Sequence, residues 1–151
     1  MREGRVRTIR GQIESATYTI IQLDRMDPTI CWKVKEFKVT NGGTASAHSD
    51  FSTGILTTEE PGLTTWALPG TFDWSENRQI AWARDCELSG AVTSGNWSLV
   101  DADNLISEDL FVVVWNRTND PGYINYYIRL AEVKVNLNEN LFATVRNKSQ
   151  G

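Results

Sequence analysis

The residues that most resemble a catalytic set lie in one polar loop. His48 is the only histidine of the 151-residue chain, and Ser46, Ser49 and Asp50 lie within two positions of it. A serine nucleophile needs a base oriented beside it by a third group, and neighbours in sequence rarely meet that geometry. Because residues 41–50 are also rich in glycine and alanine, we interpret His48 as a solvent-exposed loop residue rather than a general base.

Acidic side chains occur in three close pairs, which are Glu59–Glu60, Glu108–Asp109 and Asp101–Asp103. Paired carboxylates can serve glycoside hydrolysis. The segment from Asp101 also resembles the start of a calcium loop, but it lacks the required glycine and distal glutamate. We interpret these acids as solvated turn residues. Since phosphate-binding and dinucleotide-binding glycine motifs are also missing, we predict a protein that is not an enzyme and needs no cofactor.

The chain has too few soft ligands for a structural zinc site, which wants four clustered ligands. It contains two cysteines, Cys31 and Cys86, without a CxxC motif. We interpret both as small buried hydrophobic residues, and the sequence leaves open whether they pair as a disulfide.

Tryptophan is the aromatic residue that most needs an explanation. Trp32 and Trp115 lie within strand patterns and are predicted to be core residues. Trp66 and Trp74 lie in a long loop, where they could anchor a contact between subunits or, with Trp97, form a platform on which a sugar stacks. The third interpretation is that they only cover the edge of the domain.

Charge is distributed unevenly along the chain. Residues 1–10 hold Arg2, Arg5, Arg7 and Arg10 against one glutamate, while the remainder has 11 basic and 18 acidic residues. A basic segment on an acidic body is typical of a tail that docks on something negative. The sequence therefore predicts an assembly arm that reaches either nucleic acid or a neighbouring copy of the same chain.

Strand patterns account for most of the remaining sequence. Segments rich in β-branched and aromatic residues predict strands at 12–23, 30–39, 51–58, 79–88 and 96–100. Trp32 and Val34 have one parity, and Phe37 and Val39 have the other. A β-bulge near residues 35–36 would keep all four on one face.

The same change of parity occurs at Val133 and Val135, relative to the alternating residues Ile124 to Leu130. Two interpretations remain open there. One is a second bulge near residues 131–132, and the other is a strand that is buried on both faces or that ends.

The segment 108–130 predicts a long hairpin. Residues 111–115 are apolar without alternation, which is typical of a central strand covered on both faces. Asp120-Pro121-Gly122 fits a tight turn, so residues 119–122 are predicted to link two paired strands.

The C-terminal segment predicts a short helix that is marginal alone and must pack on something. Asn138, Glu139 and Asn140 suit its start. Leu141, Phe142 and Val145 then form an apolar face, predicted to be buried against the domain or a partner.

Together these patterns predict an all-β antiparallel sandwich, similar to a jelly roll, with residues 1–11 as a basic arm, 12–137 as the sandwich and 138–151 as a helical tail. The predicted core includes Ile20, Trp32, Val34, Phe111, Val113, Trp115, Ile128 and Leu130. Deleting residues 1–10 is then expected to leave a folded domain.

In its opening MREGRVRTIRG, its strand YINYYIRLAEVKV and its tail LNENLFATVRNKSQG, the chain resembles small β-rich structural proteins of bacterial and archaeal viruses. The resemblance implies a virion structural protein, such as a capsid, decoration or minor subunit. Such a protein would form homo-oligomers or bind other virion proteins, with nucleic acid as a further partner of the arm. No apolar run approaches membrane-spanning length and no signal peptide is apparent, so synthesis in the host cytoplasm is expected. The alternative is a non-catalytic carbohydrate-binding module that uses the loop tryptophans.

Overall fold

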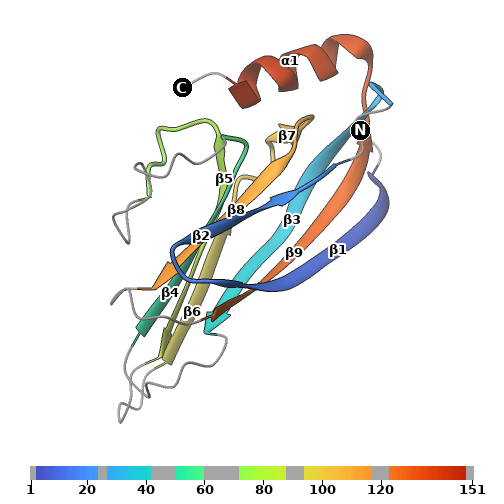
Figure 1. The fold of residues 1–151 in the computed structure, drawn as a ribbon. Coiled ribbons are helices and arrows are strands. Elements are labelled where there is room, and N and C mark those ends of the chain that lie inside the picture. The colour runs from blue at the N-terminus through green and yellow to red at the C-terminus, as the bar shows by residue number, and fades with distance from the viewer. Residues whose placement is uncertain are drawn as a thin grey trace.

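The computed structural model describes residues 3–23, 27–41, 50–59, 72–87, 94–116 and 123–148. Over these ranges the chain is mostly β, with nine strands in two antiparallel sheets and one helix near the C-terminus (Figure 1). Sheet A has the strand order β1-β9-β3-β7, and sheet B has the order β2-β8-β4-β5-β6. The elements are β1 Glu3–Glu14, β2 Thr17–Ile21, β3 Ile30–Asn41, β4 Asp50–Thr57, β5 Gln79–Glu87, β6 Ser94–Val100, β7 Leu105–Ile106, β8 Leu110–Asn116, β9 Tyr123–Lys134 and α1 Leu137–Lys148.

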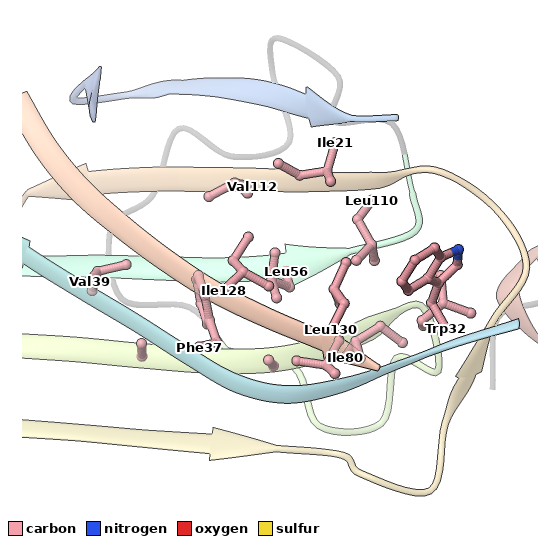
Figure 2. Close-up of a cluster of buried hydrophobic side chains, with 14 of the residues drawn as sticks. Ile21, Trp32, Phe37, Val39, Leu56, Ile80, Leu110, Val112, Ile128 and Leu130 are labelled. Carbon is pink, nitrogen blue, oxygen red and sulfur yellow. The ribbon is translucent and has the colours of Figure 1, made fainter. Parts of the chain in front are cut away.

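The core lies between the two sheets, where apolar side chains from both meet (Figure 2). The predicted core residues Trp32, Val34, Ile128 and Leu130 are all buried there. The prediction for Ile20 is wrong, because its side chain is 47% exposed. Its neighbour Ile21 points into the core instead. The residues of β2 that face sheet A are therefore the alternate ones to those predicted.

Within the predicted arm, residues 3–11 do not form a separate segment. Strand β1 runs from Glu3 to Glu14 and pairs antiparallel with β9 (Figure 1). Ile9 and Ile13 pack against the core, so this segment is an integral strand whose arginines conceal its alternating pattern. The boundary predicted between residues 11 and 12 therefore falls inside a strand.

The strand predicted over residues 12–23 is divided between the two sheets. A turn at Ser15 and Ala16 ends β1, and β2 then pairs with β8 in sheet B. Ala16 has a φ of 62°, in the left-handed region that non-glycine residues adopt infrequently. The turn thus moves the chain from one layer to the other.

The bulge predicted in β3 is confirmed. Val34 pairs with Leu130 and Glu36 with Arg129, which leaves Lys35 as the additional residue. As a result Trp32, Val34, Phe37 and Val39 all face the core, although their spacing breaks a period of two.

The change of parity at Val133 and Val135 is explained by burial of β9 on both faces and not by a bulge in that strand. β9 pairs with β3 without interruption from Leu130 to Lys134, so a bulge near residues 131–132 is wrong. Instead Val133 and Val135 lie on the outer side of sheet A, where they pack with Cys31 and with Ala143 of α1. Strand β9 is therefore buried on both faces at this end.

The predicted hairpin is also corrected. β8 lies in sheet B and β9 in sheet A, so the segment between them joins two layers rather than two paired strands. Its residues 117–122 lie outside the described ranges. The expectation that β8 is covered on both faces is confirmed, because Val112 and Val114 contact the main core while Val113 and Trp115 belong to a second cluster.

That second cluster lies on the outer face of sheet B. Ile55, Trp82, Val113 and Trp115 are its buried members, and Phe72 packs against them. The registers align Tyr18, Val113, Ile55, Trp82 and Leu99 in one row across all five strands. Sheet B is consequently apolar on both faces.

Candidate functional site

The predicted catalytic and metal-binding candidates give no assembled site in the part of the chain that the structure describes. Ser46, His48 and Ser49 lie outside it. Asp109 accepts a hydrogen bond from the backbone N–H of Leu23 at 3.1 Å. Among described residues, no three His, Cys, Asp or Glu side chains are grouped so that they could hold a metal ion.

Several acidic residues instead stabilise local structure. Arg78 forms a bidentate pair with Glu76, with both N···O distances at 2.8 Å, and contacts Glu59 at 3.3 Å. The hydrogen bond to Glu76 raises the pKa of the Arg78 guanidinium. This network joins the end of β4 to the turn that precedes β5.

The arginines of the predicted arm lie along β1, except for Arg2, which is outside the described residues. Arg5 lies 3.9 Å from Glu132, and Arg7 donates a 3.4 Å hydrogen bond to the carbonyl of Gln22. Arg10 lies opposite Tyr127 of β9. Arg5, Arg7 and Arg10 thus lie at different points along one paired strand rather than together in a tail.

Arg10 belongs to a hollow that the sequence did not predict. An open depression of about 610 Å³ is lined by Arg10, Gly11, Gln12, Lys38, Thr40, Asn125, Tyr126 and Tyr127. A Cβ on Gly11 would lie 2.5 Å from the Tyr126 hydroxyl, so glycine leaves space for that ring. Burial raises the pKa of Tyr126 above its ordinary value.

Exposed aromatic residues occur on the outer face of sheet B. Trp74 and Trp97 are 68% and 41% exposed. Phe72 stacks edge-on against Trp97 at 5.7 Å, and the Arg84 guanidinium lies 5.3 Å from the centre of the Phe72 ring. Trp66, the second predicted platform residue, lies outside the described ranges.

The helix α1 exposes several large apolar side chains. Leu137, Leu141, Phe142 and Val145 are between 58% and 77% exposed. Leu141, Phe142 and Val145 are therefore not buried against their own domain. Of the two predicted alternatives, burial against a partner stays a prediction. We refer to these four side chains as the α1 stripe; residues 137, 141 and 145 repeat every four positions and so share one side of the helix.

Residues outside the stripe attach α1 to the domain at the end of the sheets near β7 (Figure 1). Ala143 is buried in the cluster of Cys31, Val133 and Val135. The hydroxyls of Ser107 and Thr144 are 2.8 Å apart, and Arg146 lies 3.6 Å from Asp101. A small residue and polar contacts thus fix the helix, which leaves its large apolar residues facing outward.

The start of α1 also differs from the prediction. Asn136 is the capping residue: its Oδ1 accepts a hydrogen bond from the Glu139 N–H at 2.8 Å, and its Nδ2 donates to the Glu139 carboxylate at 3.1 Å. The first of these bonds satisfies the backbone N–H of Glu139 at the helix start, and the second joins the two side chains. The helix begins at Leu137 rather than Asn138. Leu137 therefore belongs to the α1 stripe, although the sequence pattern did not place it in the helix.

Comparisons of the chain with family models, with curated proteins and with solved structures found no match. The described part of the chain has no helix with the length and apolar character required to cross a membrane.

Proposed function

We propose that this protein is a structural subunit with a jelly-roll fold, which functions by assembling with copies of itself, in a virion shell or as a component attached to one. The α1 stripe is the observation that carries the proposal. It lies on a helix that packs on the domain through Ala143 and Thr144 and exposes four large apolar side chains. Contiguous exposed apolar patches of this kind mark protein–protein contacts.

The strand pairing supports the jelly-roll assignment. β1 pairs with β9, β2 with β8, β3 with β7 and β4 with β5. These pairs are nested, as in a long antiparallel hairpin that has been rolled into two sheets, and β6 adds an outer strand to sheet B. Double-sheet jelly rolls occur in viral capsid proteins and also in lectins, so the fold agrees with the proposal without deciding between the two functions.

The partner that we propose is a second copy of the chain, because sheet B offers an apolar surface that could bind the α1 stripe. Sheet B exposes Ile20, Trp74, Trp97 and Leu99 at or beside its two edge strands. A contact between α1 of one copy and sheet B of the next joins two different surfaces, and such contacts generate rings or open filaments rather than isolated pairs.

The stripe also has a place for an incoming side chain. An open hollow of about 240 Å³ between α1 and β7 is lined by Leu105, Phe142 and Ala143 together with charged residues. Pockets that accept one anchoring side chain are typical of the centres of protein interfaces.

The test is the oligomeric state of the full-length protein, measured by light scattering after size exclusion and by electron microscopy. We expect the parent to form rings, shells or other multimers. Replacing Leu141 and Phe142 together by serine should yield monomers with the thermal stability of the parent, because both residues are exposed. Replacing Trp97 and Leu99 by serine should also reduce assembly, whereas Asn138→Ser on the same helix should leave it unchanged.

A monomeric parent at high concentration would contradict the assembly proposal. In that case the sugar-binding function becomes the favoured one. Its support is the exposed pair Trp74 and Trp97 beside Phe72 on one sheet face. Quenching of tryptophan fluorescence by a panel of glycans, lost in Trp97→Ala, would be its signature.

A further inference from the structure

On the outer face of sheet A, polar and aromatic side chains lie in rows that cross three strands. Gln12, Asn125 and Thr40 form one row, in which Gln12 Nε2 donates to Asn125 Oδ1 at 2.9 Å and Asn125 Nδ2 donates to Thr40 Oγ1 at 3.4 Å. All three residues line the 610 Å³ hollow. The hydrogen bonds fix the positions of two amide groups at the surface.

The adjacent row places one aromatic ring between two cations. Tyr127 pairs with Arg10 on one side and with Lys38 on the other, and all three line the same hollow. Neighbouring strands are about 4.8 Å apart, so the two cationic residues originate on backbones about 10 Å apart. Lys38 contacts Glu36 at 3.1 Å and its side chain remains half exposed. Arg10 forms no ion pair with any residue that the structure describes.

Charge is concentrated on this sheet although the whole chain is acidic. Strands β1, β3 and β9 contain eight lysines and arginines against four acidic residues. The strands of sheet B contain one basic residue against three acidic ones. The next row of sheet A adds Arg129, which is exposed, follows Tyr127 on the same face and lies opposite Glu36 of β3. The strands of sheet A are therefore net positive and those of sheet B net negative, so an anion is more favourable beside sheet A.

We propose that this face of sheet A binds single-stranded nucleic acid. Arg10, Lys38 and Arg129 would contact phosphates, and Tyr127 would stack on a base, as aromatic residues do in other single-strand binding sites. The Asn125 amide keeps a second N–H and a second oxygen lone pair that a base edge can use. A neutral sugar would leave the cations without a role, and a paired base cannot reach an aromatic ring on a sheet surface.

The site is separate from the α1 stripe. It shares no residue with the stripe, and Tyr127 precedes Val133, which α1 covers, by six residues of one strand, or about 20 Å. The binding proposal therefore stands independently of assembly through α1, and it can be measured on the Leu141→Ser/Phe142→Ser variant as well as on the parent.

The experiment is fluorescence anisotropy of a labelled 12-mer oligothymidylate titrated with full-length protein at several salt concentrations. We expect saturable binding whose affinity falls as salt rises. Tyr127→Ala should weaken binding about tenfold through the loss of stacking, while Tyr127→Phe should bind like the parent. Arg10→Gln should weaken binding and lower the salt slope by about 0.7, as one phosphate contact is lost.

Lys134→Gln is the matched control, because it removes one exposed charge from β9 outside the hollow. Absence of binding by the parent would overturn the proposal. It would also be overturned if Lys134→Gln weakened binding as much as Arg10→Gln, which would indicate diffuse charge attraction. A third contrary result is tight binding of dextran sulfate with no effect of Tyr127→Ala, which would assign the face to anionic polysaccharide. Circular dichroism of each variant checks that it is folded.

Discussion

Gly54 shows how closely the two layers pack at the level of one residue. It lies in β4 and faces Val39 and Phe37 of the opposite sheet. A Cβ at this position would lie 2.5 Å from Val39 Cγ1 and 3.0 Å from Phe37 Cζ. Both neighbours are buried, so neither side chain has space to retreat.

We therefore predict that Gly54→Ala lowers the free energy of unfolding by about 1–3 kcal/mol, the usual range for overpacking a core. Urea denaturation measures the change. Gly4→Ala is the control, because the nearest atom to its added Cβ lies at 3.5 Å, an ordinary contact distance. Equal stability of the two variants would show that the sheets can separate locally at Gly54.

Residue type alone did not determine the environment of the aromatic residues. Trp32, Trp82 and Trp115 are buried, whereas Trp74 and Trp97 are exposed. Trp97 and Trp82 lie on the same face of neighbouring strands, but β6 is an edge strand and β5 is not. Position within the sheet therefore decides which tryptophan remains available to a ligand or partner.

At the scale of elements, the bulge in β3 has a specific consequence. Lys35 is the additional residue of β3, because its neighbours Val34 and Glu36 pair with consecutive residues of β9. Removing Lys35 would give an uninterrupted ladder in which Trp32, Val34 and Phe37 still face the core. Removing Lys33 would instead turn either Trp32 or Val34 to the outer face.

The prediction is that a variant lacking Lys35 remains folded and is more stable than a variant lacking Lys33 by at least about 2 kcal/mol, the contribution of one buried side chain. Thermal and urea unfolding of the two single-residue deletions provide the comparison. If both deletions unfold the protein equally, the bend at the bulge matters more than the parity of the core residues.

The helix α1 turns its large apolar side chains away from the core. Its apolar spacing was apparent in the sequence, and the usual inference is that such a face turns toward the core. Here the core contact is Ala143, because a small side chain lets the helix approach sheet A closely. The large apolar residues are consequently directed outward, which the spacing alone cannot distinguish.

For the whole molecule, β1 determines what an N-terminal truncation does. The strand covers one edge of β9, and Ile9 packs on the core. Deleting residues 1–10 should therefore lower the free energy of unfolding by at least about 2 kcal/mol, from lost apolar burial and lost ladder hydrogen bonds. This replaces the expectation of an intact domain after the deletion.

A triple variant, Arg5→Gln/Arg7→Gln/Arg10→Gln, removes the positive charges of β1 and keeps the strand. It should retain nearly the stability of the parent, because exposed ion pairs contribute about 0–1 kcal/mol each, but it should lose affinity for oligothymidylate. A deletion variant that unfolds like the parent would restore the interpretation of this segment as a dispensable arm.

Local pattern was sufficient to predict the all-β class, the strands from β3 to β6, the bulge at Lys35 and a short C-terminal helix. These features follow from side-chain parity and turn composition, which are properties of neighbouring residues. Only the tertiary structure decided which strands share a sheet, that β1 is a strand of sheet A, and that β8 and β9 belong to different layers. Pairing partners are distant in sequence, and an arginine-rich edge strand has the same composition as a tail. Contacts between such distant segments place Arg10, Tyr127 and Lys38 in one row and turn the apolar residues of α1 outward. The sequence alone therefore indicated neither arrangement.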